Sequence, residues 1–152
     1  MSEDPLARLA ALGLELPEVV PPVAAYVPAV RTGQHVYVSG QVPIVAGKLA
    51  AAGKVGAEVS AEDARGLARI CALNGLAAIH ALVGLEQVVR VVKVVGFVAS
   101  APDFTAQPAV VNGASELLGA VFGEAGRHAR SAVGVAVLPL DAPVEVELIV
   151  EV

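Results

Sequence analysis

The sequence predicts an α+β domain in which two helices pack on one face of a mostly antiparallel β-sheet. Helical and strand patterns are mixed along the chain, strand pairs suited to hairpins stand near both ends, and one Val-rich strand is interrupted by charge only twice. These three observations are typical of that class. The 152 residues fit a single domain, 1–152, with residues 1–15 as an N-terminal helical extension.

The N-terminal part predicts a short helix followed by a hairpin. Ser2 has the character of a helix cap and Gly13 that of a helix end. The proline-rich residues 17–30 should run extended into a turn at 31–34 and a return strand over 35–43. Gly40 lies inside that strand, where it permits a β-bulge or a close backbone approach. The Gly/Ala-rich residues 44–59 are expected to form a loop.

The central part predicts two helices around one strand. Ser60, with Asp63 three residues later, caps a long amphipathic helix that should end near Gly84. Residues 88–99 are rich in valine, as expected of a strand covered on both faces. A second helix is expected over about 109–122. Because the helices cover one sheet face, the other face should pack against neighbouring subunits.

The last quarter of the chain predicts two more strands, 128–139 and 143–152. In the first strand, Arg130 shares one face with the small residues Ala132, Gly134 and Ala136, so another backbone or a ligand can come close to that face. In the second strand, Glu145 and Glu147 point to the same side.

Composition limits the partners that the protein can have. Hydrophobic residues make up 56% of the chain, above the usual share. No run of about 20 apolar residues could span a membrane, since the longest apolar stretch, 19–30, contains three prolines. The first residues lack a signal-peptide pattern. We therefore expect a cytoplasmic protein with no membrane partner, which buries its surplus apolar surface in a homo-oligomer.

Charge and cysteine content narrow the function further. The net charge is -5 and aromatic residues make up only 3% of the chain. Phosphate tracking needs basic patches and base stacking needs aromatic side chains, so we expect no nucleic acid partner. Cys71, the single cysteine, is expected to be a buried thiol in a reducing compartment. No Cys or His spacing matches a zinc site, and we expect neither metal nor cofactor.

Arg130 raises the main functional question. Its guanidinium is always charged, and the natural partner for its planar set of donors is a carboxylate. Spacing alone favours a structural ion pair with Glu145 or Glu147 on a neighbouring strand, and the other candidate is the carboxylate of a ligand. Either glutamate could equally belong to the solvated face of an edge strand, and we keep that interpretation for Glu147.

Three stretches resemble the motifs of one family. "VSGQVP" at 38–43 is similar to a Ser-Gly-Gln-x-Pro hairpin, "VVRVVKVVGFVASAPDF" at 88–104 to a Val-Lys-rich strand ending in Asp-Phe, and "ARSAVGVAVLPLDAPVEVELIV" at 129–150 to a C-terminal signature. Together they resemble the YjgF/RidA group of reactive intermediate deaminases, from about Tyr26 to the end of the chain.

This resemblance implies a homotrimer of chorismate-mutase-like fold, with a ligand cleft at each subunit boundary. Arg130 would hold the carboxylate of a 2-imino or 2-enamino acid, and hydrolysis would yield the 2-keto acid and ammonia. Glu145 would orient the attacking water, Tyr26 would line the cleft, and Gly40 would present its backbone amide to the ligand. The family's asparagine after Asp-Phe falls on Pro108 by simple counting, with Asn112 or Ser115 as substitutes.

Differences from the family pattern keep other functions open. Ala132 stands where the family often has a cysteine, so thiol chemistry does not carry over. The leading hypothesis is an imine deaminase with Arg130 and Glu145 as catalytic residues and Tyr26, Gly40 and Asn112 as binding residues. The alternative is a trimer that binds small 2-keto acids without turnover. A ribonuclease ranks last because of the acidic charge balance.

Overall fold

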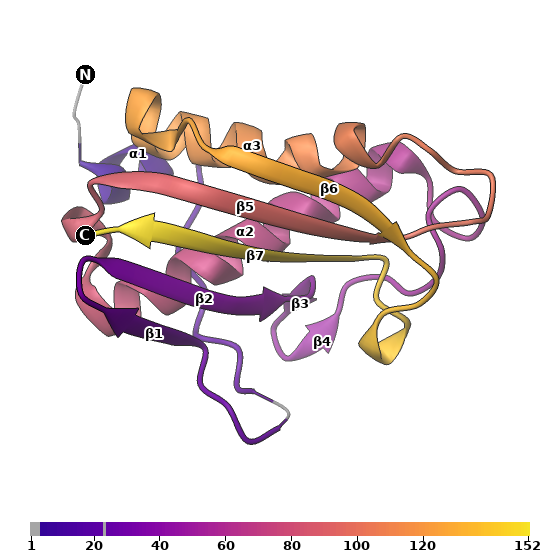
Figure 1. Ribbon diagram of the computed structural model, residues 1–152, viewed down its shortest axis with the longest axis horizontal. Coiled ribbons are helices and arrows are strands. Elements are labelled where there is room, and N and C mark those ends of the chain that lie inside the picture. Colours follow the sequence, from indigo (N-terminus) through magenta and orange to yellow (C-terminus); the bar gives the residue numbers. More distant parts are fainter. Residues whose placement is uncertain (1–3, 23) are drawn as a thin grey trace.

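The computed structural model describes residues 4–22 and 24–152. The chain forms a five-stranded sheet with helices on one face (Figure 1). The strand order is β1-β2-β7-β5-β6. All neighbouring strands are antiparallel except β5 and β6. The predicted α+β class and mostly antiparallel sheet are therefore confirmed. The strands are β1 Ala29–Thr32, β2 His35–Gln41, β5 Arg90–Ala99, β6 Ala129–Val135 and β7 Val144–Glu151.

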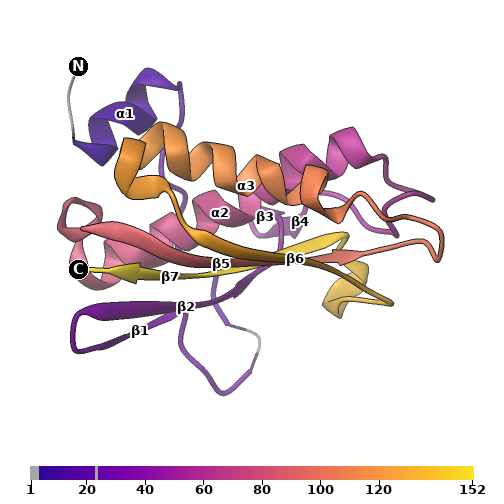
Figure 2. The same cartoon turned by 45° about the horizontal axis from the view of Figure 1, so that its top comes forward.

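The two long helices lie side by side on the same sheet face (Figure 2). They are α2, Ala61–Val83, and α3, Gln107–Phe122, and both agree with the predicted helices to within a few residues. The short helix α1, Pro5–Ala11, packs on α3. Three 3-10 turns, η1 Leu85–Gln87, η2 Gly123–Gly126 and η3 Pro139–Asp141, complete the described secondary structure outside the strands. No helix in the described ranges covers the opposite face of the sheet (Figure 2).

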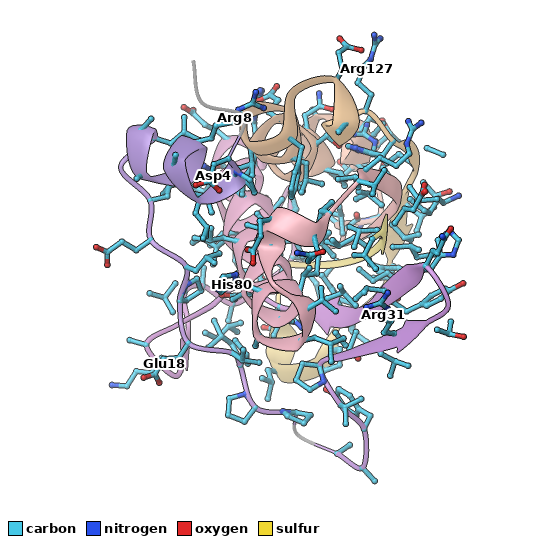
Figure 3. The ribbon with its side chains drawn as sticks, turned by 90° about the vertical axis from the view of Figure 1, so that its left-hand side faces the viewer. Asp4, Arg8, Glu18, Arg31, His80 and Arg127 are labelled. Carbon is cyan, nitrogen blue, oxygen red and sulfur yellow. The ribbon has the colours of Figure 1, made fainter. Side chains whose placement is uncertain are left out.

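Helix α1 is shorter than the sequence predicts. Asp4 caps it, since the Asp4 side chain accepts a hydrogen bond from the Leu6 amide at 3.2 Å. The expected cap Ser2 lies outside the described residues. Gly13, at φ 73°, follows the end of the helix as predicted. Arg8 donates from Nη1 to the Val121 carbonyl at 3.3 Å, which ties α1 to α3 (Figure 3).

The hairpin β1–β2 forms as predicted, but the segment that follows is more than a loop. Gly40 lies where the pairing of β2 with β7 shifts register, between Val38 and Gln41, so the predicted bulge is present. Within 44–59 the chain forms a second small hairpin of β3, Ile44–Val45, and β4, Lys48–Leu49. Its turn places Ala46 at φ 52°. Gly47, at φ 80°, completes the turn, but the two strands have two residues each and are too short to give an alternating pattern in the sequence.

Helix α2 supplies much of the core. Ser60 accepts the Asp63 amide at 3.1 Å, which confirms the predicted cap. At the other end, His80 Nδ1 accepts the Leu85 amide at 3.1 Å (Figure 3). Among the described helices, α2 is long and apolar enough to cross a membrane, but its buried face packs against the sheet as expected of a core helix. Cys71 is buried there, and burial raises the pKa of its thiol well above the ordinary range.

Helices cover one face of the sheet and leave the other face exposed. Alternate residues of β7 are buried beneath the helices, namely Val144, Val146, Leu148 and Val150. The opposite face, which we call the open face, leaves Val30, Tyr37 and Val133 exposed at 50%, 47% and 43%. Glu147 lies exposed on the open face, but β7 is the central strand of the sheet. The prediction of an edge strand for Glu147 was wrong because alternation alone does not give strand order.

Candidate functional site

The five predicted site residues fall into two separate groups in the chain. Tyr26, Gly40 and Glu145 line one pocket. Arg130 and Asn112 are hydrogen-bonded to each other at the edge strand β6, beside α3. The first group approaches the open face, and the second lies on the helical side of the sheet. The structure therefore brings together the members of each group but not the two groups.

Strand pairing sets the direction of Arg130. It stands opposite Val94, and Val94 stands opposite Leu148, both of which are buried under the helices. Paired residues project to the same side of a sheet, so Arg130 projects toward α3. Its Nη1 donates to Asn112 Oδ1 at 2.8 Å and to Ser115 Oγ at 3.2 Å.

Pro108, Asn112 and Ser115 all contact the guanidinium. Besides the two bonds of Nη1, Nη2 donates to the Pro108 carbonyl at 3.3 Å. The three positions considered as equivalents of the family's asparagine thus lie on consecutive turns of α3, and all three contact Arg130. Asn112, predicted to bind substrate, holds Arg130 in this structure.

No carboxylate neutralises Arg130 within the described part of the chain. The predicted alternative of an ion pair with Glu145 or Glu147 is absent, and the oxygens that Arg130 meets are neutral. An arginine carries five N–H donors. Nη1 uses two and Nη2 uses one, so Nε–H and one Nη2 hydrogen have no acceptor among residues 4–22 and 24–152. Nε and Nη2 lie on the same edge of the guanidinium, the edge to which a carboxylate can bind in bidentate fashion.

Glu145 belongs to the first group and lies in a pocket of about 160 Å³ that we call the Glu145 pocket. The carboxylate is half-buried and accepts no hydrogen bond from any described residue. Burial, and to a lesser extent the charge of Glu147, raises the pKa of Glu145 above its ordinary value of about 4.5. A carboxylate in this setting is a stronger base than one in water.

Gly40 makes room for that carboxylate. A Cβ atom built on Gly40 would lie 2.1 Å from Glu145 Oε1. The bulge of β2 and the missing side chain together let the glutamate lie against the backbone. This arrangement agrees with the predicted close approach at Gly40, although the group that comes close is a side chain rather than a backbone.

The remaining walls of the Glu145 pocket are mostly apolar. Tyr26 is 47% exposed, and its hydroxyl makes no hydrogen bond to a described residue. Leu140, from the turn η3, lies at φ 63°, which is unusual for a residue with a side chain. That turn is held by an ion pair between Lys54 and Asp141 and by a 2.9 Å bond from the Gly53 amide to the Asp141 carbonyl. The other lining residues are Val20, Pro21, Pro22, Pro28, Gln41, Val42, Ile44 and Pro139.

The sequence did not point to two residues that lie near these groups, His128 and Leu140. His128 stands behind Arg130, and its Nε2 lies 2.9 Å from Ser115 Oγ. His128 directly precedes β6, and in the predicted strand 128–139 its position two residues before Arg130 put both on one face, a spacing that could have revealed it. Leu140 had no comparable signal, because its position depends on an irregular turn. Within the described ranges, no group of three or more His, Cys, Asp or Glu side chains could hold a metal ion.

Comparisons with known proteins place these residues in context. Residues 6–152 match the family described as "YjgF/chorismate_mutase-like, putative endoribonuclease". Protein TCP17 of Trypanosoma cruzi is 46% identical over 149 residues, which cover 95% of this chain and 92% of that protein. A Shewanella oneidensis structure solved as a "putative endoribonuclease" is 34% identical with a TM-score of 0.94, covering 98% of this chain and 99% of that one.

A more distant structure carries a ligand. Escherichia coli TdcF, solved with bound serine, is 27% identical to this chain. The alignment covers 86% of this chain and 91% of TdcF, with a TM-score of 0.63.

Proposed function

Since the chain belongs to the YjgF/chorismate-mutase-like family, we propose that it hydrolyses 2-imino or 2-enamino acids to 2-keto acids and ammonia, in clefts between copies of the chain. The observation that carries this proposal is the state of Arg130. Its charge meets only neutral oxygens, and its Nε–H has no acceptor in the described chain. A ligand carboxylate would supply what the guanidinium lacks.

The positions of Arg130 and Glu145 support a site shared between copies. In one chain the two side chains project from opposite faces of the sheet, so they do not reach the same small ligand. The open face also exposes Val30, Tyr37 and Val133, an apolar surface that a second copy would cover. We propose a homotrimer in which Arg130 of one copy faces the Glu145 pocket of the next.

The chemistry follows from these two groups. Arg130 fixes the carboxylate of the ligand, so that the neighbouring imine carbon has one orientation toward the water. Glu145 accepts a proton from that water as the water oxygen bonds to the imine carbon and the C=N electron pair moves to the nitrogen, which takes up a proton from solvent. Glu145 then returns its proton to the nitrogen of the resulting carbinolamine and the C–N bond breaks. The hydroxyl group loses its proton to water as the C=O bond forms, which gives ammonia and the 2-keto acid. The raised pKa of Glu145 makes it a better proton acceptor at neutral pH.

The serine bound to TdcF is consistent with this substrate class. Serine carries a carboxylate and a nitrogen on the adjacent carbon, the same two groups that define a 2-imino acid. TdcF is the relative that binds it, and we extend only the class of ligand to this chain. The buried lone thiol of Cys71 fits a reducing compartment, so the cytoplasm is the location that we propose.

The main alternative is a trimer that binds small carboxylic acids without turning them over. It would use Arg130 in the same way but would not need the unpartnered base at Glu145. Cleavage of RNA, which the family description names, has less support here because the net charge is -5.

A single experiment separates these possibilities. Ammonia and 2-keto acid release would be measured with 2-imino acids generated in situ by an amino-acid oxidase, for the wild type, Arg130→Ala and Glu145→Gln. We expect turnover in the wild type alone, with 2-keto acid binding retained in Glu145→Gln. Full turnover in Glu145→Gln would remove its assigned role, and a stable monomer by light scattering would remove the shared cleft.

A further inference from the structure

A network of hydrogen bonds runs from the Gly126 carbonyl through His128 and Ser115 to the Arg130 guanidinium. The Gly126 carbonyl lies 2.6 Å from His128 Nδ1, and His128 Nε2 lies 2.9 Å from Ser115 Oγ. Ser115 Oγ in turn accepts from Arg130 Nη1 at 3.2 Å. We propose that Ser115 and His128 position Arg130 for carboxylate binding, an inference that rests on the function proposed above.

The direction of each bond follows from the first one. The Gly126 carbonyl can only accept, so His128 Nδ1 carries a hydrogen. In the neutral imidazole, Nε2 is then an acceptor, and the Ser115 hydroxyl donates to it. The lone pairs of Ser115 Oγ are thereby left for Arg130. His128 decides which way the serine points, and the serine decides where Nη1 lies.

The Gly126 end of this hydrogen-bond network packs against α3. Gly126 is buried, and a Cβ atom at this position would lie 2.3 Å from the Leu118 carbonyl of α3. The backbone at Gly126 therefore packs directly on the helix that also carries Ser115. Both ring nitrogens of His128 are therefore bonded to groups that lie on α3 or pack against it.

This network orients the arginine without neutralising it. Nearby carboxylates in the sequence are paired elsewhere, Glu116 with Arg65, Glu124 with Arg127 and Asp141 with Lys54. A carboxylate in the place of Ser115 would compete with the ligand for the guanidinium. Neutral acceptors leave its charge for the ligand, and an arginine that is already ordered loses less conformational entropy on binding.

The test compares binding of 2-oxobutanoate with binding of its neutral amide, by calorimetry. We expect Ser115→Ala and His128→Leu each to weaken 2-oxobutanoate binding roughly three- to tenfold, the range for the loss of one ordinary hydrogen bond, because the bond to the ligand itself remains. Affinity for the amide should stay the same. Ser115→Thr retains the hydroxyl and His128→Gln retains an acceptor near Nε2, so both should bind 2-oxobutanoate within about twofold of the wild type.

A double-mutant cycle distinguishes positioning from general damage. In an Arg130→Ala background, adding Ser115→Ala should cause no further loss, because the serine acts through the arginine. Wild-type affinity in Ser115→Ala and His128→Leu, with weak binding in Arg130→Ala, would overturn the positioning role and leave the proposed function intact. Wild-type affinity in Arg130→Ala would overturn the proposed function itself. Melting temperature and light scattering check that each variant is folded and assembled.

Discussion

Arg130 and Glu145 project from opposite faces of one β-sheet, Arg130 toward α3 and Glu145 into a pocket at the open face. Neither has a partner of opposite charge among residues 4–22 and 24–152 of its own chain. If one ligand uses both groups, the two must come from different copies. This relationship leads to a test that needs no knowledge of the physiological substrate.

Mixing two inactive variants should restore activity. Arg130→Ala subunits retain Glu145, and Glu145→Gln subunits retain Arg130, so a mixed trimer contains some complete clefts. With equal amounts and random assembly, about one quarter of the sites carry both residues, since half of the copies retain each one. Ammonia release after co-expression of differently tagged variants is the measurement. Isolated mixed trimers without activity would show that both residues must belong to one chain.

Gly40→Ala should impair turnover without unfolding the protein. The added Cβ would lie 2.1 Å from Glu145 Oε1, so the carboxylate must rotate away. Gly40 has no positive φ, so alanine causes no backbone strain. Misplacing a catalytic group by about 1 Å can lower the rate about 100-fold, and we expect a loss of that order in kcat.

The matched control for this variant is Gly66→Ala on α2, where an added Cβ meets nothing within 4 Å. It should leave kcat unchanged. Wild-type kcat in Gly40→Ala, with an unchanged melting temperature, would show that the position of the Glu145 carboxylate does not limit the reaction.

The sequence predicts the helices and strands of this fold more completely than it predicts how the site residues are arranged. Hydrophobic alternation and caps such as Ser60 depend on neighbours along the chain, and those elements agree with the structure. Strand order depends on contacts between distant segments, which is why Glu147 was assigned to an edge. The Arg130 contacts from Pro108, Asn112 and Ser115 also depend on how α3 packs beside β6.

The pH dependence of stability should reveal the raised pKa of Glu145. Because the folded-state pKa lies above the unfolded value near 4.5, the folded protein binds more protons between the two values. Stability therefore falls as pH rises through that window, and the loss is complete above the folded pKa. Glu145→Gln lacks this loss, so its free energy of unfolding relative to the wild type should increase from about pH 4 toward neutral pH.

Chemical denaturation of both proteins across this range gives the difference at each pH, and titration of the other carboxylates cancels in the comparison. A difference that decreases with rising pH would mean that the folded state stabilises the ionised carboxylate. That result would contradict the assignment of Glu145 as an unpartnered base in a desolvated pocket.

The contact between α2 and α3 should depend on one glycine of α3. A Cβ atom at Gly113 would lie 1.9 Å from the Arg65 carbonyl, a backbone atom that cannot move without shifting α2. Gly113→Ala should therefore destabilise the protein by about 1–3 kcal/mol or more, the usual cost of overpacking.

Gly119 lies on the same helix with open space around it, so Gly119→Ala should stabilise the protein by about 0.5–1 kcal/mol through helix propensity. Denaturant unfolding of the pair measures both effects. Opposite signs would establish that α2 and α3 touch at Gly113, whereas equal stabilisation would mean that the helices are farther apart and that Arg130 is held by a looser layer.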